Sequence, residues 1–412
     1  MRKIWIDNLR WVTVLLVLFY HVIYFYNNKD VFGGIGGFSD GPQYQDVVMY
    51  ILYPWFMPLL FLLAGISAKY SLEKHTAKEW FRLRTRKLLV PSTIGLFVFH
   101  WMTGYFNTIM ARQDVLASVK QPALYFLWVI SGTGPLWFIQ DLWLFSLLLL
   151  LIRKISPTSN TTGQKEESIP PLKGAGGYRS INTNSFLIIW IFLLGILFWL
   201  GEQTLIRNPR PESADGLYNL YKPLFYLIPF LMGYYVFSRD TVQETVKRFW
   251  IPLMAGAVVS GIALIVTTWG ENNTTPEYLG SPLNCLYSWM MCLAMMGWFN
   301  ASFDRTNKFA GYMTRSSFGI YIVHYFVIAS FGYVLKVHTQ LPPLAIYLIL
   351  TIAVFTLSPL IYEGLRRSPF LSWCIFGEKH PHRERSLKKK KRVKIKIQQI
   401  LEPLWKRNQQ KK

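Results

Sequence analysis

Long apolar runs separated by short polar segments recur along the chain, and they predict helices that span a membrane. A span needs about 20 consecutive, mostly apolar residues to cross the hydrocarbon core of a bilayer. We expect ten spans, over residues 6–26, 47–68, 88–110, 135–152, 184–202, 217–237, 250–269, 282–299, 316–335 and 342–363. The pattern therefore predicts an all-α, polytopic transmembrane bundle of about ten helices.

Two polar segments set the expected boundaries within the chain. Residues 156–183 are rich in Ser, Thr, Pro and Gly, and they predict a flexible loop between four N-terminal and six C-terminal spans. The apolar spans end before residue 377, so we expect one integral membrane domain over residues 1–377 and a basic tail over residues 378–412. Two interpretations of the tail stay open: a solvated run of charges, or a segment that binds anionic lipid.

The distribution of Lys and Arg over the loops predicts the orientation in the cell membrane. The N-terminus and every second loop together hold 20 of these residues, whereas the other set of loops holds 6. Because cytoplasmic loops are enriched in Lys and Arg, we expect both termini in the cytoplasm. No small-residue cleavage site follows the first apolar run, which is therefore expected to be a retained span and not a signal peptide.

Composition agrees with a membrane protein and argues against other classes. Of the 412 residues, 52% are hydrophobic and only 16% are charged, whereas a soluble domain carries about 25% charged residues. The net charge of +22 follows the loops and the tail, so membrane topology and anionic lipid explain it better than nucleic acid. The three cysteines lack metal-ligand spacing, and we expect no disulfide framework and no metal site.

Three ionisable residues, Asp7, Arg10 and His21, accompany the first span. An α-helix turns 100° per residue, so the azimuths of Arg10 and Asp7 fall within about 20° and about 40° of that of His21. All three are therefore predicted to lie on one helix face, with His21 roughly 16 Å beyond Arg10 along the axis. Ionisable residues in a span are costly to insert and point to function. An imidazole can take a proton from a hydroxyl and return it to a leaving group, which makes His21 the first catalytic candidate.

A run of cations, Arg82, Arg84, Arg86 and Lys87, precedes the third span. These residues are either a positive-inside anchor or a site for a phosphorylated donor, since Arg and Lys bind phosphate through charge-assisted hydrogen bonds. No glycine-rich phosphate loop accompanies them.

Two further polar patterns lie in later spans. Trp137 and Asp141 follow Gly134-Pro135 at the start of the fourth span, and a buried acid there needs a partner or a proton. Ser317, Tyr321 and His324 are spaced at i, i+4 and i+7 in the ninth span, so they share one face. Each pattern has two interpretations: a substrate site, or an interfacial Trp and a polar contact between helices.

Five sequence pieces, in this order, resemble the membrane acyltransferase-3 family, and within it the branch that modifies glucans and other surface glycans. The pieces are I-D-N-L-R with a His eleven residues after its Arg, F-L-L-A-G-I-S, a basic cluster before L-L-V-P, G-P-L-W-F-I, and S-F-G-I-Y-I-V-H. The chain has Ala64-Gly65 where the family usually has Ser-Gly. The paired-arginine signature of the family is matched in spacing by Arg84 and Lys87, with Lys as the second member.

The resemblance implies transfer of an acyl group, such as acetyl or succinyl, from cytoplasmic acyl-CoA to a hydroxyl of a surface or exported glycan. It also implies that His21 is the essential catalytic residue, helped by Arg10. With acyl-CoA as co-substrate, we expect no further cofactor. The expected sites are these: His21, Arg10 and Asp7 for catalysis; Arg82, Arg84, Arg86 and Lys87 for the donor; Trp137, Asp141, Ser317, Tyr321 and His324 for the acceptor.

The rival hypothesis is a transporter or flippase of a glycan or lipid-linked substrate, in which the in-span ionisable residues form a proton or substrate path. The chain shows no repeated halves, a feature of many transporter folds. A third hypothesis, a scaffold without activity, leaves the alignment of Asp7, Arg10 and His21 unexplained.

Overall fold

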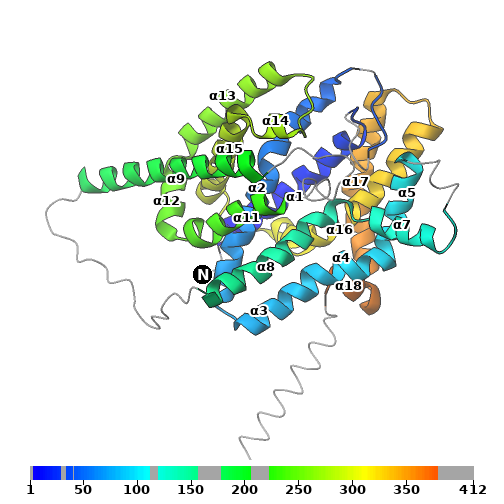
Figure 1. Cartoon of the computed structure of the whole chain (residues 1–412), viewed down its shortest axis with the longest axis horizontal. Helices are drawn as coiled ribbons and strands as arrows, with labels where there is room; N and C mark the ends of the chain where they lie inside the picture. Colours follow the sequence, from blue (N-terminus) through cyan, green and yellow to red (C-terminus); the bar gives the residue numbers. More distant parts are fainter. Residues whose placement is uncertain are drawn as a thin grey trace, which may run out of the picture.

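The computed structural model describes residues 3–28, 34–39, 41–111, 119–155, 178–205 and 222–378. In these ranges every regular element is a helix, and the helices pack side by side into one bundle (Figure 1). The predicted all-α helical bundle is confirmed. The basic tail from residue 379 on lies outside the described residues, as do residues 156–177 of the expected loop; helix α9 begins at Tyr178, inside the range expected to be loop.

Each of the ten predicted ranges contains helix, and eight helical stretches are long and apolar enough to cross a membrane. Seven of these stretches correspond to the long helices α1 (Ile4–Phe25), α2 (Val47–Leu72), α8 (Trp137–Ile155), α9 (Tyr178–Leu205), α13 (Trp250–Thr268), α16 (Lys308–His338) and α17 (Pro343–Arg366). The eighth, Ala77–Met110, contains the third span. Helix α15 (Pro282–Ser302) is also long. Of the ten ranges, two fall short of these limits: α15, which buries polar residues such as Asn284 and Ser288, and the short helix α11 (Pro223–Met232), which continues as a π-helical turn, η5 (Gly233–Phe237).

The third span is built from several pieces. Two π-helical turns, η2 (Thr85–Leu89) and η3 (Leu96–His100), flank helix α4 (Val90–Gly95), and helix α5 (Trp101–Ala111) follows. Such turns insert an extra residue into the helical ladder and often occur at functional sites. The remaining short helices are α3 (Ala77–Arg84), α7 (Ala123–Ser131), α12 (Asp240–Arg248), α14 (Pro276–Leu279) and α18 (Pro369–Phe376).

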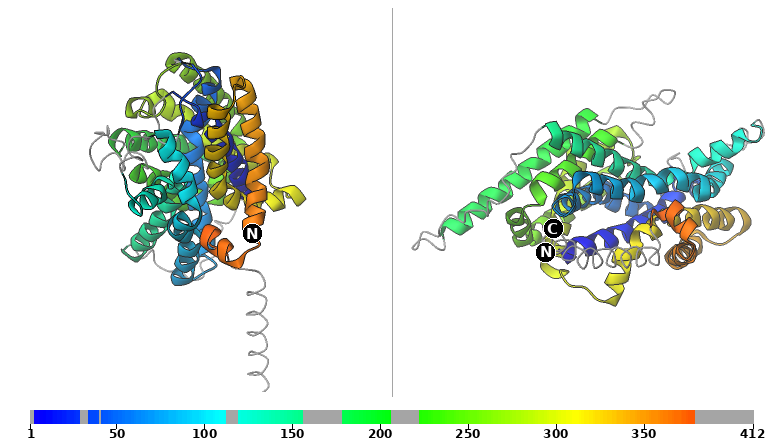
Figure 2. Two further views of the ribbon diagram at one scale, coloured as in Figure 1. Left: turned by 90° about the vertical axis from the view of Figure 1, so that its right-hand side faces the viewer. Right: turned by 90° about the horizontal axis from the view of Figure 1, so that it is seen from below.

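Helix α1 lies inside the bundle, where it packs against α2, α15, α16 and α17. Figure 1 shows its ribbon, in dark blue, near the middle of the bundle, and Figure 2 shows it from two further sides. Its Ile4 end, with residues 303–305 and the start of α12, is called the Lys3 end of the bundle below. The opposite end is called the Lys336 end, because Lys336 there donates hydrogen bonds to the carbonyls of residues 35–37.

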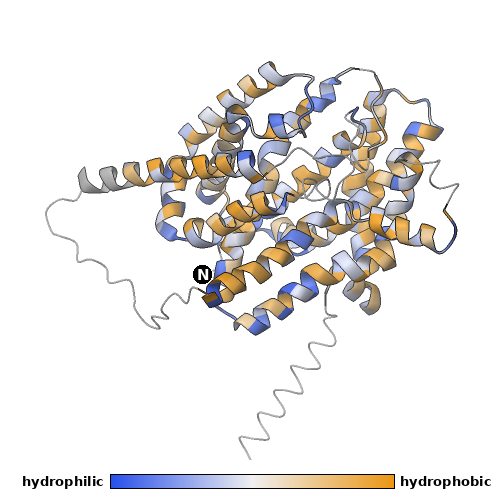
Figure 3. Cartoon of the chain, in the orientation of Figure 1, coloured by the Kyte–Doolittle hydropathy of each residue, from blue (hydrophilic) through white to orange (hydrophobic). Residues whose placement is uncertain are grey.

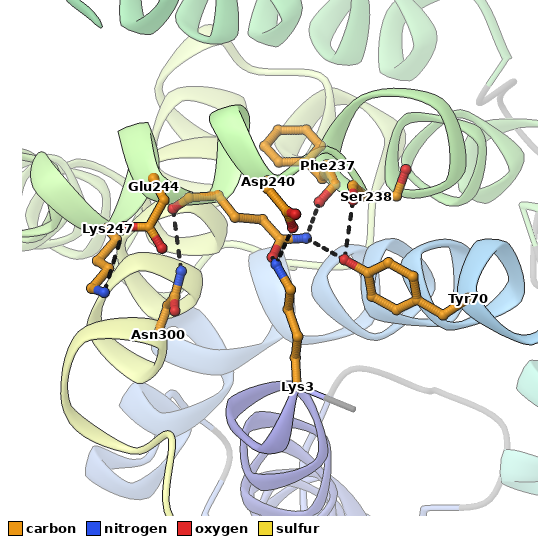
Figure 4. A network of polar contacts seen from close by, with 9 residues as sticks. Lys3, Tyr70, Phe237, Ser238, Asp240, Glu244, Lys247 and Asn300 are labelled. Atoms are coloured by element: carbon orange, nitrogen blue, oxygen red, sulfur yellow. Dashed lines mark hydrogen bonds and ion pairs between the residues drawn. The ribbon is translucent and has the colours of Figure 1, made fainter. Parts of the chain in front are cut away.

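A polar network closes the Lys3 end (Figure 4). The Lys3 ammonium donates to Asp240 and, at 2.6 Å, to the side-chain oxygen of Gln243. The Gln243 amide in turn donates to the Tyr70 hydroxyl at 3.0 Å and to the Phe237 carbonyl at 2.7 Å. These bonds fix the start of α1 against α2 and α12, and so they fix where the polar residues on α1 lie.

Two glycines let α2 and η5 touch through their backbones. A Cβ on Gly65 would lie 2.0 Å from the Phe230 carbonyl oxygen, and a Cβ on Gly233 would lie 2.1 Å from the Leu62 carbonyl oxygen. Small residues at such a crossing are typical of helices packed in a membrane. The Gly65 of the A-G pair therefore has a packing role.

The outward faces of several peripheral helices are apolar (Figure 3). The large exposed apolar side chains on α9, α13 and α17 include Phe186, Ile189, Trp190, Leu193, Ile251, Val259, Ile262, Leu344, Leu348 and Ile352. A soluble monomer rarely exposes so extensive an apolar surface. These faces suit contact with lipid acyl chains, whereas α1 at the centre is free to carry polar groups.

Candidate active site

Two histidines from distant parts of the chain meet between α1 and α16. The Nε2 atom of His324 lies 3.3 Å from the Nδ1 atom of His21, and the two ring centroids are 5.1 Å apart. His324 is fully buried, whereas His21 is partly buried. His324 was expected only in the acceptor site, and the structure places it against the expected catalytic histidine.

The hydrogen-bond partners of the two imidazole rings show which ring nitrogen carries a hydrogen. Nδ1 of His21 lies 2.8 Å from the Val17 carbonyl oxygen, and Nδ1 of His324 lies close to the Tyr321 carbonyl oxygen. A carbonyl only accepts, so each Nδ1 carries a hydrogen. In the neutral rings each Nε2 then carries a lone pair. The His324 lone pair faces Nδ1–H of His21, and the His21 lone pair is left as the basic atom.

Tyrosines surround His21. The ring of Tyr20 lies 5.3 Å from the imidazole, that of Tyr325 lies 5.4 Å away and that of Tyr24 lies 6.0 Å away, all with edge-to-face geometry. These phenols come from α1 and α16. They place hydroxyl groups in an otherwise apolar interior, close to the pair of histidines.

The other expected acceptor residues lie on two helices, Ser317 and Tyr321 on α16 and Trp137 and Asp141 on α8. The Tyr321 hydroxyl donates to the Pro135 carbonyl, and so it joins α16 to the start of α8. Ser317 is buried on α16, about two turns from His324. The Trp137 ring lies 5.4 Å from that of Tyr226. Asp141 is buried one turn further along α8, near enough to Tyr226 for its charge to act on that hydroxyl.

A second polar cluster lies nearer the Lys3 end, on the same helix α1. Arg10 pairs with Asp7 at 3.3 Å and donates to the Ser67 hydroxyl at 2.5 Å. Ser67 in turn donates to the Leu63 carbonyl at 2.7 Å, which orients its oxygen toward the guanidinium. Eleven residues of α-helix separate Arg10 from His21, which corresponds to about 16 Å along the axis.

The four expected donor cations divide into two groups. The Arg84 guanidinium stacks on the Trp80 ring at 5.1 Å and lies close enough to that of Arg10 for the two positive charges to repel each other. Arg82, on the same helix α3, is exposed to solvent. The structure therefore brings Arg84, but not Arg82, toward the cluster on α1.

Arg86 and Lys87 instead contact the two residues that follow helix α18. Arg86 donates to the Gly377 carbonyl at 3.1 Å. Lys87 forms an ion pair with Glu378 at 3.0 Å, and Glu378 also pairs with Arg366 at 3.7 Å. Both cations have partners within the chain, so their contacts are those of residues that dock α18 against the η2 turn.

Two features of the site were not expected from the sequence. Ser67 closes the F-L-L-A-G-I-S piece and accepts a hydrogen bond from Arg10. Its place in a piece that resembles the family was the signal in the sequence for a role at the site. Tyr20 precedes His21 directly, but an aromatic residue in a span is too common to indicate a site.

Comparison with known proteins identifies the family. The sequence profile of the acyltransferase domain, which defines the acyltransferase-3 family, matches residues 3–363. The match includes α1, the histidine pair and every expected site residue. Neither a curated protein nor a solved structure matches the chain. Because the profile covers most of the 412 residues, and because the fold is a bundle of helices that can span a membrane, the chain belongs to the acyltransferase-3 family of membrane acyltransferases.

Proposed function

We propose that this chain moves an acyl group, acetyl or succinyl, from cytoplasmic acyl-CoA to a hydroxyl of a cell-surface or exported glycan, with His21 as the general base. The observation that carries the proposal is the contact between His21 and His324. It leaves one basic nitrogen on a ring whose orientation is held by Val17 and His324. Family membership supports acyl transfer as the reaction class.

The reaction follows from this arrangement. Nε2 of His21 takes the proton of the acceptor hydroxyl as its oxygen forms a bond to the thioester carbonyl carbon. The imidazolium keeps both contacts of its Nδ1–H, with the Val17 carbonyl and with the His324 lone pair. When the tetrahedral intermediate breaks its C–S bond, Nε2–H protonates the departing thiolate. The products are the glycan ester and free CoA.

In this proposal the donor binds at the Lys3 end, on the cytoplasmic side. Arg10 and Arg84 present two guanidinium groups in one region, and guanidinium binds phosphate through paired hydrogen bonds. Ser67 and Asp7 orient Arg10 and do not touch the reacting atoms. The long, thin pantetheine arm then carries the thioester along α1 toward His21.

The test is acyl transfer by membranes that contain the His21→Ala variant at the same level as the unaltered protein. We expect the loss of a general base to lower the rate by about 10²–10⁴-fold. His75→Ala is the matched control, because His75 is exposed just beyond α2 and its Nδ1 lies 3.0 Å from the Ser71 carbonyl oxygen, far in sequence from α1 and α16. Full activity of His21→Ala would remove His21 from catalysis.

Release of CoA from acyl-CoA by the purified protein separates an enzyme from a transporter. An acyltransferase releases CoA in proportion to the ester formed, whereas a flippase releases none.

A further inference from the structure

A buried acid and a buried base lie near each other where α9 ends and α11 begins. Glu202 is 6% exposed and Lys222 is 7% exposed. Their charges attract each other, but within the described residues they form no direct ion pair. The Lys222 ammonium lies 3.4 Å from the Tyr53 hydroxyl and 5.5 Å from the centre of that ring.

Several polar atoms of this region are buried without a partner. Oε2 of Glu202, Oδ2 of Asp141 and the hydroxyl of Tyr20 have no hydrogen bond and almost no contact with solvent. Tyr226 lies within electrostatic reach of Glu202, Asp141 and Tyr53. An unsatisfied buried polar atom costs about 1–3 kcal/mol, so natural proteins keep few of them. Three in one region leave hydrogen-bonding capacity that a bound ligand can use.

The same region reaches the basic nitrogen through aromatic rings. Tyr53 stacks on Tyr20 with ring centroids 5.8 Å apart, and Tyr20 lies 5.3 Å from His21. The sequence of contacts from Lys222 through Tyr53 and Tyr20 therefore ends at the histidine pair. The rings of Tyr53 and Tyr20 thus connect a ligand held by Glu202 and Lys222 to His21.

We infer that Glu202, Lys222, Tyr53 and Tyr20 form a binding subsite for an uncharged, hydroxyl-rich sugar of the acceptor glycan. This inference rests on the proposed function and adds the substrate class. A carboxylate accepts hydrogen bonds from sugar hydroxyls, an ammonium donates to sugar oxygens, and tyrosine rings pack against the C–H face of a sugar.

The balance of charges selects against a charged sugar. Within the subsite itself the acid Glu202 and the base Lys222 offset each other, so a neutral ligand adds no charge to it. A uronic acid or an amino sugar would add a net charge, and burial of an uncompensated charge costs several kcal/mol of binding free energy. The subsite therefore favours a neutral sugar by desolvation as well as by hydrogen bonding.

The experiment is calorimetric titration of the purified full chain in detergent with four hexasaccharides: laminarihexaose and maltohexaose, which are neutral, hexagalacturonate, which is anionic, and the glucosamine hexamer, which is cationic. We expect at least one neutral hexamer to bind more tightly than either charged one. Glu202→Gln should weaken that binding about tenfold or more, and Tyr20→Phe and Tyr53→Phe about threefold to tenfold, as the loss of one charged or one neutral hydrogen bond predicts.

Thermal unfolding of the same variants distinguishes a ligand contact from a structural one. The Tyr20 hydroxyl has no partner in the protein, so Tyr20→Phe should leave stability unchanged or raise it while binding weakens. Glu244→Gln, an exposed acid of α12 paired with Lys247 at 3.5 Å, is the matched control and should bind as the unaltered protein does.

Three results would overturn the subsite: no binding of either neutral hexamer, tighter binding of a charged one, or affinity unchanged in both Glu202→Gln and Tyr20→Phe. The His21→Ala variant separates this inference from the proposed function. It should bind the neutral hexamer normally and lose transfer. Retained transfer in His21→Ala would refute the general base and leave the binding result intact.

Discussion

The Nε2 atom of His324 lies 3.3 Å from the Nδ1 atom of His21, across 303 positions of sequence. This contact makes His324 a positioning residue for the proposed base. We expect His324→Leu to lower kcat about tenfold to hundredfold with little change in the KM for acyl-CoA, because the ring of His21 loses one of the two acceptors that hold its Nδ1–H. Steady-state kinetics in detergent measure both constants.

The conservative variant His324→Asn supplies the control for this prediction. Its amide oxygen can accept a hydrogen bond, so it should recover part of the lost kcat, which a role in packing alone does not predict. Equal activity of the Leu variant and the unaltered protein would contradict the positioning role.

Ser67 should act on donor binding through Arg10. Ser67→Ala removes the hydroxyl that accepts from the guanidinium at 2.5 Å. We expect the KM for acyl-CoA to rise about threefold to tenfold, as the loss of one such hydrogen bond predicts, whereas kcat changes less. Ser67→Thr keeps the hydroxyl and should behave as the unaltered enzyme; a KM raised equally by both variants would argue for a steric effect.

Arg84 and Arg82 offer a matched pair on one helix. Arg84 lies within electrostatic reach of Arg10, whereas Arg82 is exposed. Arg84→Gln should raise the KM for acyl-CoA about tenfold or more, since a hydrogen bond to a charged group contributes about 1.5–3 kcal/mol. Arg82→Gln should change it less than twofold, because exposed charges are screened by salt. An equal rise of the KM in the two variants would show that donor binding depends only on the overall positive charge of this segment.

Gly65 should tolerate no side chain. The Cβ of Gly65→Ala would lie 2.0 Å from the Phe230 carbonyl oxygen, so α2 and η5 must move apart at a cost of about 1–3 kcal/mol. Thermal unfolding in detergent should show a lowered Tm. Gly364→Ala is the control, because a Cβ there meets no atom within 4 Å, and its Tm should be unchanged or raised.

The orientation of the bundle can be tested by cysteine labelling. The native Cys285, Cys292 and Cys374 are all buried, so a cysteine introduced at the surface will label above a low background. Glu277→Cys, on the short helix α14 before α15, should react with an impermeant maleimide on intact cells. Lys74→Cys, just beyond the C-terminal end of α2, should react only after permeabilisation. The reverse pattern would invert the proposed topology.

The sequence predicted the helices well and their contacts poorly. Apolar runs of the required length mark spans directly, and all ten ranges contain helix. The π-helical turn η2, which carries Arg86 and Lys87, has no such signature, since π-helical turns depend on tertiary packing and not on local apolar periodicity. The helix of Arg10 and His21 was predicted, yet its partners Ser67 and His324 come from elements that only the folded chain brings near.

The basic run shows the same limit at the level of single residues. Four cations in one short segment looked equivalent in sequence, and in the structure they have different surroundings. Arg86 and Lys87 bind Gly377 and Glu378 of the C-terminal segment, at a separation of 291 residues. Charge pattern alone carries no information on such distant partners, so it could not separate Arg84 from its neighbours.

The closeness of Arg10 and Arg84 has a consequence for the pace of turnover. The reaction leaves the phosphates of the donor unchanged, so in the proposed function spent CoA is drawn to these two guanidinium groups as strongly as the fresh donor is. The attraction that binds acyl-CoA therefore also slows the release of CoA. An enzyme built in this way works fastest when the cytoplasm holds far more acylated than free carrier, and it slows down by itself as the free carrier accumulates.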